Sequence, residues 1–356
     1  MWVNGHSGAG GVRIIKIIIQ FCVIILWGNY LFGQNTLDLF EEAKGINATV
    51  KYNADNIDTN TTREFLPFQR GFTRQGDEWV FGVPQEDPPA TYRYMGIGPI
   101  PVKELHRYTL DTEEIHYKTN GVILYCLSFF NGDAKVLFAT QERSRTHDFG
   151  VPPGVNNAVV WIGVTSPNKV EPGPQVGFKA LKLIDRGLLD GTDDIRPLLG
   201  RNLLSVSNFE ECVIGPYTNN ADFRPGSGAD RNFAEIVKEE TQCLHISKST
   251  NGYKYPYFNT QKLDLNNCAV VFTCRLKGKG KVSPMIWWHY PTKKNFWSHY
   301  AGQAVELGDT WQTVSLWHYC TVSNMDHAAV SIAVGSPQAE IYVDDMSLKI
   351  IDPRSK

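Results

Sequence analysis

The sequence predicts an all-β protein in which two related β-sandwich modules follow an N-terminal export segment. From about residue 62 onward, short apolar runs alternate with Gly, Pro and Asn turns, and segments typical of helices are few. Several of these apolar runs recur, in the same order, in the second half of the chain. One apolar stretch preceded by basic residues stands near the N-terminus.

Composition agrees with this fold class and argues against some classes of function. The 356 residues suffice for two domains, and a hydrophobic content of 42% with 20% charged residues is typical of a globular protein. A formal net charge of −2 gives no electrostatic basis for binding nucleic acid. Aromatic residues reach 12%, with nine Trp. This surplus is a first indication of a surface that holds sugars or peptides.

Residues 1–33 are predicted to be a signal peptide. Arg13 and Lys16 precede an apolar run over 17–27, which has the length of a signal-peptide core and falls short of the ~20 residues of a membrane span. Cleavage is expected after Gly33. The alternative is an uncleaved signal anchor, which would attach the protein to a membrane. In both cases the remainder is expected to be secreted or placed at the cell surface or in the periplasm, beginning with a flexible lead-in over 34–61.

Residues 62–186 and 201–352 are predicted to be the two modules, joined by a linker over 187–200. Three matches support the repeat: NAVVWIGVTSP (157–167) with HAAVSIAVGSP (327–337), ALKLID (180–185) with SLKIID (347–352), and VILYC (122–126) with VVFTC (270–274). Their offsets are 170, 167 and 148 residues. The change in offset implies that the second module gains about 22 residues between roughly 275 and 327, where aromatic residues are concentrated.

The cysteines give no zinc or CxxC spacing. Without the signal peptide six remain, five of them in the C-terminal half, so at most two bridges can form there and the pairing stays open. Cys268 and Cys274 could share one strand, and their even spacing places both on the same face. They are expected to pack as thiols rather than to bond to each other.

Three motifs of the second module give a family resemblance. The module opens with NLLSVSNFEE (202–211), continues through DTWQTVSLW (309–317) and closes with IYVDDMSLKI (341–350). In this order the motifs resemble the jelly-roll carbohydrate-binding modules of families 4, 9 and 22, which have a galactose-binding-like β-sandwich. The resemblance covers about 202–350, and the first module is then a divergent copy. The predicted architecture is two tandem jelly-roll β-sandwiches.

The resemblance implies a structural calcium ion where the first and last strands of the second module meet. Ca²⁺ takes six to eight oxygen ligands, and hard oxygens would come from Glu210, Glu211, Asp344 and Asp345. The alternative is a solvated acidic edge that discourages pairing with other sheets. In the first module Gly177 stands at the position of Asp344, so no calcium is expected there.

The resemblance also implies that aromatic rings stack on a glycan while polar groups contact its hydroxyls. On the strand WQTVSLWHY, Val314 and Leu316 are expected to face the core, and Trp317 and Tyr319 to share the opposite face. Trp287 and Trp288 are adjacent, so one should point inward and one outward. The candidate carbohydrate-binding residues are Tyr255, Tyr257, Trp287, Trp288, Trp297, Trp317 and Tyr319.

The predicted function is therefore non-catalytic binding of a polysaccharide, with a glycan as partner. One alternative is a polysaccharide lyase or glycoside hydrolase of jelly-roll fold, because His289, His299 and His318 with Tyr300 and Lys293 could form an acid/base set. No paired-carboxylate motif apart from the Asp pair, and no common hydrolase motif, supports this alternative. A second alternative is a surface adhesion or assembly protein whose aromatic residues bury a protein interface.

Overall fold

The computed structural model describes most of the chain beyond residue 62. The described residues are 36–39, 63–67, 72–81, 92–117, 122–131, 134–141, 146–165, 176–189, 198–217, 223–224, 234–247, 257–260, 268–289, 297–320, 327–334 and 339–353. The predicted signal peptide and most of the predicted lead-in lie outside them. Within these ranges, no helix is both long and apolar enough to cross a membrane.

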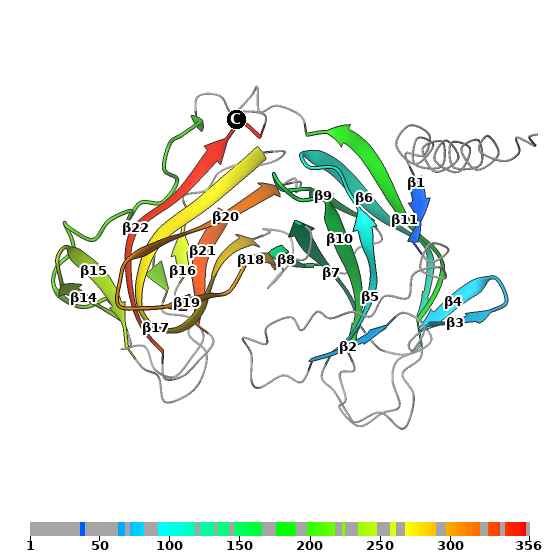
Figure 1. Ribbon diagram of the computed structural model, residues 1–356, viewed down its shortest axis with the longest axis horizontal. Helices are drawn as coiled ribbons and strands as arrows, with labels where there is room; N and C mark the ends of the chain where they lie inside the picture. Colours follow the sequence, from blue (N-terminus) through cyan, green and yellow to red (C-terminus); the bar gives the residue numbers. More distant parts are fainter. Residues whose placement is uncertain are drawn as a thin grey trace, which may run out of the picture. The chain divides into compact units, whose positions relative to one another are not determined.

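The chain divides into two compact units, Met1–Leu37 and Asp38–Lys356. The described part of the first unit is the beginning of β1 (Thr36–Asp38). All other strands belong to the second unit, which is almost entirely β-structure (Figure 1). The prediction of an all-β protein is confirmed.

Residues 63–189, here called the first module, form two layers of strands. One layer has the order β3-β4-β11-β6-β9 and the other β8-β7-β10-β5-β2, in which β2 runs parallel to β5. The rings of Phe129 and Phe149, from β7 and β9, have centroids 5.6 Å apart, so the two layers pack face to face. The strands are β2 (Arg63–Pro67), β3 (Phe72–Gln75), β4 (Glu78–Phe81), β5 (Tyr92–Pro101), β6 (His106–Tyr117), β7 (Val122–Asn131), β8 (Ala134–Gln141), β9 (Thr146–Gly150), β10 (Asn157–Thr165) and β11 (Val176–Leu188).

Residues 198–353, here called the second module, are organised around one strand of 22 residues, β17 (Cys268–His289). Its first half pairs with β22 and β20, and its second half pairs with β21 and β18. The strand β18 also pairs with β8. The other strands are β12 (Gly215–Pro216), β13 (Phe223–Arg224), β14 (Ala234–Lys238), β15 (Gln242–Ile246), β16 (Tyr257–Asn259), β18 (Trp297–Gly302), β19 (Val305–Leu307), β20 (Gln312–Cys320), β21 (His327–Val334) and β22 (Glu340–Ile351).

Two glycines let β17 pass from one layer to the other. Gly278 and Gly280 have φ angles of +133° and +113°, a backbone conformation that residues with a Cβ rarely adopt. A Cβ on Gly278 would stand 2.1 Å from the carbonyl oxygen of Glu340 on β22. The backbones therefore approach closely where the strand changes partners.

Strand pairing corrects one of the three sequence matches. β10 and β21 agree with the offset of 170, because Ala158 pairs with Phe129 and Ala328 pairs with Trp288. Phe129 thus corresponds to Trp288, 159 residues later, and β7 corresponds to the second half of β17. The match of 122–126 with 270–274 is wrong, since 270–274 lie in the first half of β17.

The added length of the second module lies between β17 and β20. On β11 and β22, Leu183 pairs with Leu110 and Ile350 pairs with Val270, so β6 corresponds to the first half of β17. Leu110 also pairs with His147 of β9, and Val270 pairs with His318 of β20, an offset of 171. The offset thus rises from 159 to 171 between residues 289 and 312. The gain is 12 residues rather than 22, and it includes β19.

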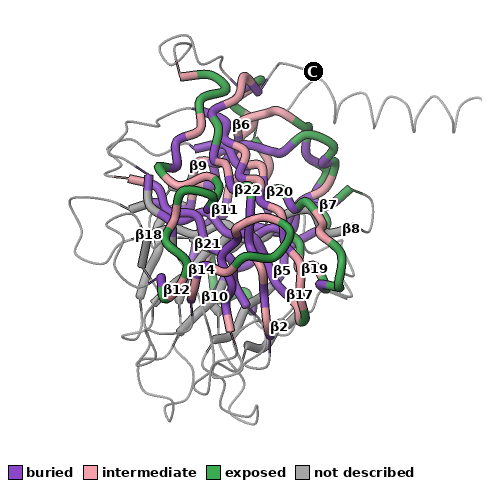
Figure 2. Tube along the Cα trace, turned by 90° about the vertical axis from the view of Figure 1, so that its left-hand side faces the viewer, coloured by how far each residue is buried: buried purple, intermediate pink, exposed green. Residues whose placement is uncertain are grey.

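The core of the second module follows the alternation of β17. Its inward side chains at 268, 270, 272, 274 and 276 are at most 1% exposed. Cys268 and Cys274 are both among them, which confirms that they share one strand and one buried face. β21 is buried along nearly its whole length, in the colour of buried residues in Figure 2.

Candidate functional site

Trp287 and Trp288 point to opposite faces of the second half of β17, because successive side chains of a strand alternate. Trp288 is fully buried, and its ring lies 5.5 Å from that of His318 on β20, between the two layers. Trp287 belongs instead to a separate apolar cluster with Met285, Ala329 and Ala333. The expectation that one indole points inward is confirmed. The candidate role of Trp288 is corrected, since a ring with no exposed face cannot stack on a sugar.

The cluster around Trp287 lies on the outer side of the layer formed by β16, β21, β17 and β18. Its members on β21, Ala329 and Ala333, are small and fully buried. Ser331 lies on the same strand between the two alanines; its hydroxyl is buried and has no hydrogen-bond partner in the described part of the chain. Backbone register forms two rows across the layer: Asn259, Ala329, Trp287 and His299, then Tyr257, Ser331, Met285 and Ala301.

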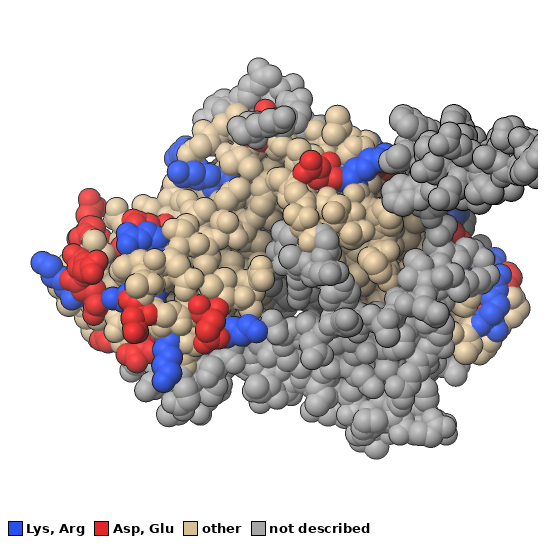
Figure 3. Space-filling view, viewed as in Figure 1, with Lys and Arg blue, Asp and Glu red and all other residues tan. Residues whose placement is uncertain are grey.

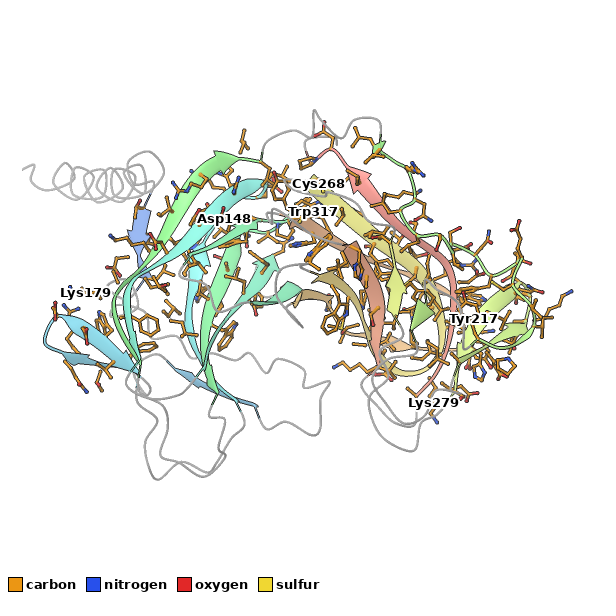
Figure 4. The ribbon with its side chains drawn as sticks, turned by 180° about the vertical axis from the view of Figure 1, so that it is seen from behind. Asp148, Lys179, Tyr217, Cys268, Lys279 and Trp317 are labelled. Atoms are coloured by element: carbon orange, nitrogen blue, oxygen red, sulfur yellow. The ribbon has the colours of Figure 1, made fainter. Side chains whose placement is uncertain are left out.

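The end of β20 is covered by the first module. Val314 and Leu316 are buried in the core as expected. Tyr319 is 1% exposed and packs with Leu189 and Ala269, and Trp317 packs against the same cluster. Tyr319 is thereby corrected from a sugar contact to a packing residue. Trp317 lies near Cys268 at one end of the second module, and Lys279, which pairs with Glu340 of β22, lies far from them (Figure 4).

The remaining predicted residues fall partly outside the described residues. Tyr255 lies outside them altogether, as does Lys293. The backbones of Tyr257, Trp297, His289, His299 and Tyr300 are described through their strands, but their side chains are not. His318 is 4% exposed and packed in the core beside Trp288. The structure therefore removes His318 from the alternative acid/base set, because substrate could not reach it.

The opening and closing segments of the second module lie side by side. The Leu203 N–H donates to the Leu348 carbonyl at 2.8 Å, and the Met346 N–H donates to the Ser207 carbonyl at 2.6 Å. The side-chain oxygen of Asn202 accepts hydrogen bonds from the Leu204 and Leu348 amides. This is the arrangement in which the resemblance places a calcium ion.

A β-bulge separates the two carboxylates of the closing strand. Thr273 pairs with Ser347 and Arg275 pairs with Asp344, so β22 carries one extra residue. Asp345 has a φ of +47°, a left-handed conformation that Asp tolerates better than most residues. As a result Asp344 points inward and is 3% exposed, while Asp345 points outward and pairs with Arg275 at 2.9 Å.

The four carboxylates do not surround a common point. Asp344 accepts hydrogen bonds on both oxygens, from the Thr241 hydroxyl at 2.9 Å and from the Asp345 amide at 2.8 Å. A Glu210 oxygen accepts the Gln242 N–H at 3.1 Å, and Glu211 is exposed. Among the described residues, no three His, Cys, Asp or Glu side chains are placed to hold a metal ion. The donor set does not fit the shared calcium site that the resemblance implies.

Comparison with known proteins gives structural neighbours but no sequence relatives. No protein family profile and no curated protein matches the chain. The tandem CBM22 domains of Paenibacillus barcinonensis Xyn10C are 8% identical with a TM-score of 0.34, covering 79% of this chain and 93% of that chain. The galactotriose-bound module TmCBM61 is 11% identical with a TM-score of 0.31, covering 42% and 99%.

An arabinose-bound α-L-arabinofuranosidase, MgGH51, is 11% identical with a TM-score of 0.35. That match covers 43% of this chain. The chain spans 27% of the length of the enzyme.

Three structural residues were not predicted from sequence: Gln242 and Thr241 of the second module and Trp161 of the first. Gln242 and Thr241 join the opening and closing segments, but nothing in a neutral "TQ" pair indicates a structural role. Trp161 of β10 corresponds to Ser331 of β21, and its Nε1–H donates to the Ser128 hydroxyl at 3.0 Å. Its ring lies over Gly96, where a Cβ would come within 2.8 Å. The repeat could have indicated this difference, because Trp and Ser align at an offset of 170.

Proposed function

We propose that the second module binds a glycan without catalysis, on the outer side of the β16–β21–β17–β18 layer. The observation that carries this proposal is the indole of Trp287, which belongs to a cluster separate from the core and is flanked by Ala329 and Ala333. An apolar ring with a few placed polar groups beside it is typical of sugar sites.

Ser331 supplies the polar group in this proposal. Its hydroxyl can both donate and accept, and a buried hydroxyl with no partner is costly unless a ligand satisfies it. Trp287 is 7% exposed, so binding requires its ring to become more accessible. Among the register positions beside it are Tyr257 and His299, which we propose as further contacts.

We infer a non-catalytic role because both carboxylates of the acidic pair, Asp344 and Asp345, already have hydrogen-bond or ion-pair partners. The Asp344 oxygens accept two hydrogen bonds and Asp345 pairs with Arg275. We further propose that the two modules are tandem copies of one unit and that the chain is exported to meet its glycan. In the first module the corresponding face is filled by Trp161, so we propose that only the second module binds there.

The test uses the full chain on a panel of polysaccharides that includes xylan and β-1,4-galactan. Trp287→Ala should weaken binding by about tenfold or more, since central aromatic contacts dominate binding energy. The matched control is Trp311→Ala, which removes an indole that lies under Arg275 and Lys277 on the other layer. It should leave affinity unchanged.

Tryptophan fluorescence and product analysis complete the experiment. Binding should change the quenching of wild-type fluorescence by acrylamide, and this change should vanish in Trp287→Ala. Equal affinities of the two variants would overturn the assignment of the face. New reducing ends or unsaturated products from any glycan would overturn the non-catalytic role. No binding to any glycan would overturn the proposal itself.

A further inference from the structure

The edge where the opening and closing segments meet contains an unusual concentration of acceptors around one amide. The Nε2 of Gln242 lies 2.8 Å from the Phe209 carbonyl oxygen, 2.9 Å from that of Glu210 and 3.1 Å from that of Cys212. A primary amide has two hydrogens, so three carbonyls share them. Three backbone oxygens converging on one point is an arrangement more usual around a cation.

The backbone of Gln242 extends the same arrangement. Its N–H donates to the Glu210 carboxylate at 3.1 Å, so both the main chain and the side chain hold the 209–212 turn. The preceding residue, Thr241, donates its hydroxyl to the buried Asp344 at 2.9 Å. Two consecutive residues at the start of β15 thus bind the opening turn and the closing strand.

We propose that the Gln242 amide replaces the structural cation at this edge, so that the second module keeps its fold without calcium. The amide gathers the carbonyls that a cation would otherwise collect, and Thr241 satisfies the carboxylate that would otherwise face it. Neither interaction needs a metal, and together they supply four hydrogen-bond contacts to the opening turn and the closing strand.

The 209–212 turn lies on an acidic surface. Figure 3 shows Asp and Glu side chains gathered near β14 and β15, with Lys among them. Glu210, Glu211, Glu239 and Glu240 are exposed in this region. Such a surface attracts divalent cations loosely. Magnesium should therefore act like calcium on any weak, nonspecific effect, and only a difference between the two ions reports a built site.

Thermal unfolding of the full chain in EDTA, in millimolar calcium and in millimolar magnesium tests the proposal. The wild-type Tm should be the same in all three solutions. Gln242→Ala should lower the Tm by about 5 °C, because the side chain's contacts with the three carbonyls of the 209–212 turn are lost. The control Gln312→Ala removes a side chain with one hydrogen bond, to the Glu306 carbonyl at 3.2 Å, and should leave the Tm nearly unchanged.

The nearly isosteric variant Gln242→Glu gives the most discriminating Tm measurement. It places a carboxylate oxygen among three carbonyls, which repel it, so the Tm should fall in EDTA. Calcium should restore the Tm and magnesium should not, because a flexible all-oxygen cage suits Ca²⁺ better than Mg²⁺. A wild-type Tm that falls in EDTA and recovers in calcium would overturn the proposal. So would a Gln242→Ala protein as stable as the wild type, and so would a Gln242→Glu protein indifferent to calcium.

Discussion

The carboxylate of Asp344 accepts a hydrogen bond from the backbone amide of Asp345, its neighbour in sequence, at 2.8 Å. This contact forms because a bulge breaks the alternation of β22 at these two residues. One acidic side chain is therefore buried and doubly hydrogen-bonded, and the next is exposed beside Arg275. Two identical residues in tandem have different structural roles.

That difference predicts unequal costs of substitution. Asp344→Ala should lower the free energy of unfolding by about 2–3 kcal/mol, since the Thr241 hydroxyl and the Asp345 amide both lose their acceptor. Asp345→Asn keeps a residue that tolerates the left-handed φ and should cost less than about 1 kcal/mol, as is usual for an exposed ion pair. Urea unfolding of both variants measures the two values. Equal losses would contradict the inward and outward assignment.

Substitution at the bend of β17 should be among the most damaging in the chain. Gly278→Ala places a Cβ 2.1 Å from the Glu340 carbonyl oxygen in a strained backbone conformation, so we expect a loss of about 3 kcal/mol or more. Gly308→Ala is the control, because nothing lies within 4 Å of its added Cβ. Denaturation midpoints of the two proteins should differ clearly. A mild Gly278→Ala variant would show that the close approach of β17 and β22 is not required.

Asp185 should give the first module a dependence on acidic pH. Burial alone would raise the pKa of Asp185, but hydrogen bonds from His106, Gly187 and Lys103 outweigh it and lower the pKa. A lowered pKa in the folded state adds stability above the ordinary pKa, and this stability is lost as the pH falls through the lowered value. Asp185→Asn should therefore cost about 1–2 kcal/mol at neutral pH and progressively less below about pH 4.

The measurement is urea unfolding of wild type and Asp185→Asn at neutral and acidic pH. The gap between the two proteins should narrow in acid. A gap that stays constant would mean that the carboxylate charge contributes nothing and only its shape matters.

The cysteines of the second module should differ in reactivity. Burial, with the nearby charge of Asp344, raises the pKa of the Cys243 thiol to about 11, and burial also raises that of Cys274. Both should resist iodoacetamide in the folded protein, because the thiolate is the reactive form. Cys212 is partly exposed and should be alkylated first. Peptide mass spectrometry of a time course checks the order, with urea-unfolded protein as control. Early modification of Cys243 would contradict its burial.

Much of the fold follows from residue patterns, but the pairing of strands does not. Apolar runs identify β10, β11, β21 and β22 as strands. β22 alternates between buried and more exposed side chains, whereas β21 and the described part of β10 are buried on both faces. The match of VILYC with VVFTC failed because short apolar runs resemble each other wherever they occur. Only the backbone partners of Phe129 and Leu110 show that β7 and β6 take pairing positions like those of the two halves of β17.

Sequence patterns predict part of the candidate site, but not the contacts between residues far apart in the chain. Alternation predicts that Trp287 and Trp288 face opposite sides, and it correctly places Val314 and Leu316 in the core. It cannot predict that Leu189 covers Tyr319, because that contact joins residues far apart in sequence. The role of Gln242 is likewise invisible to sequence patterns, since its side chain acts only through carbonyls of a distant turn.

The single strand β17 couples the two layers of the second module through one continuous backbone. Because the strand belongs to both layers and passes between them at Gly278 and Gly280, we expect the two layers to unfold together. Its amides should exchange with solvent deuterium as one cooperative block. In the first module β6 and β7 are separate strands, so we expect the amides of its two layers to exchange independently.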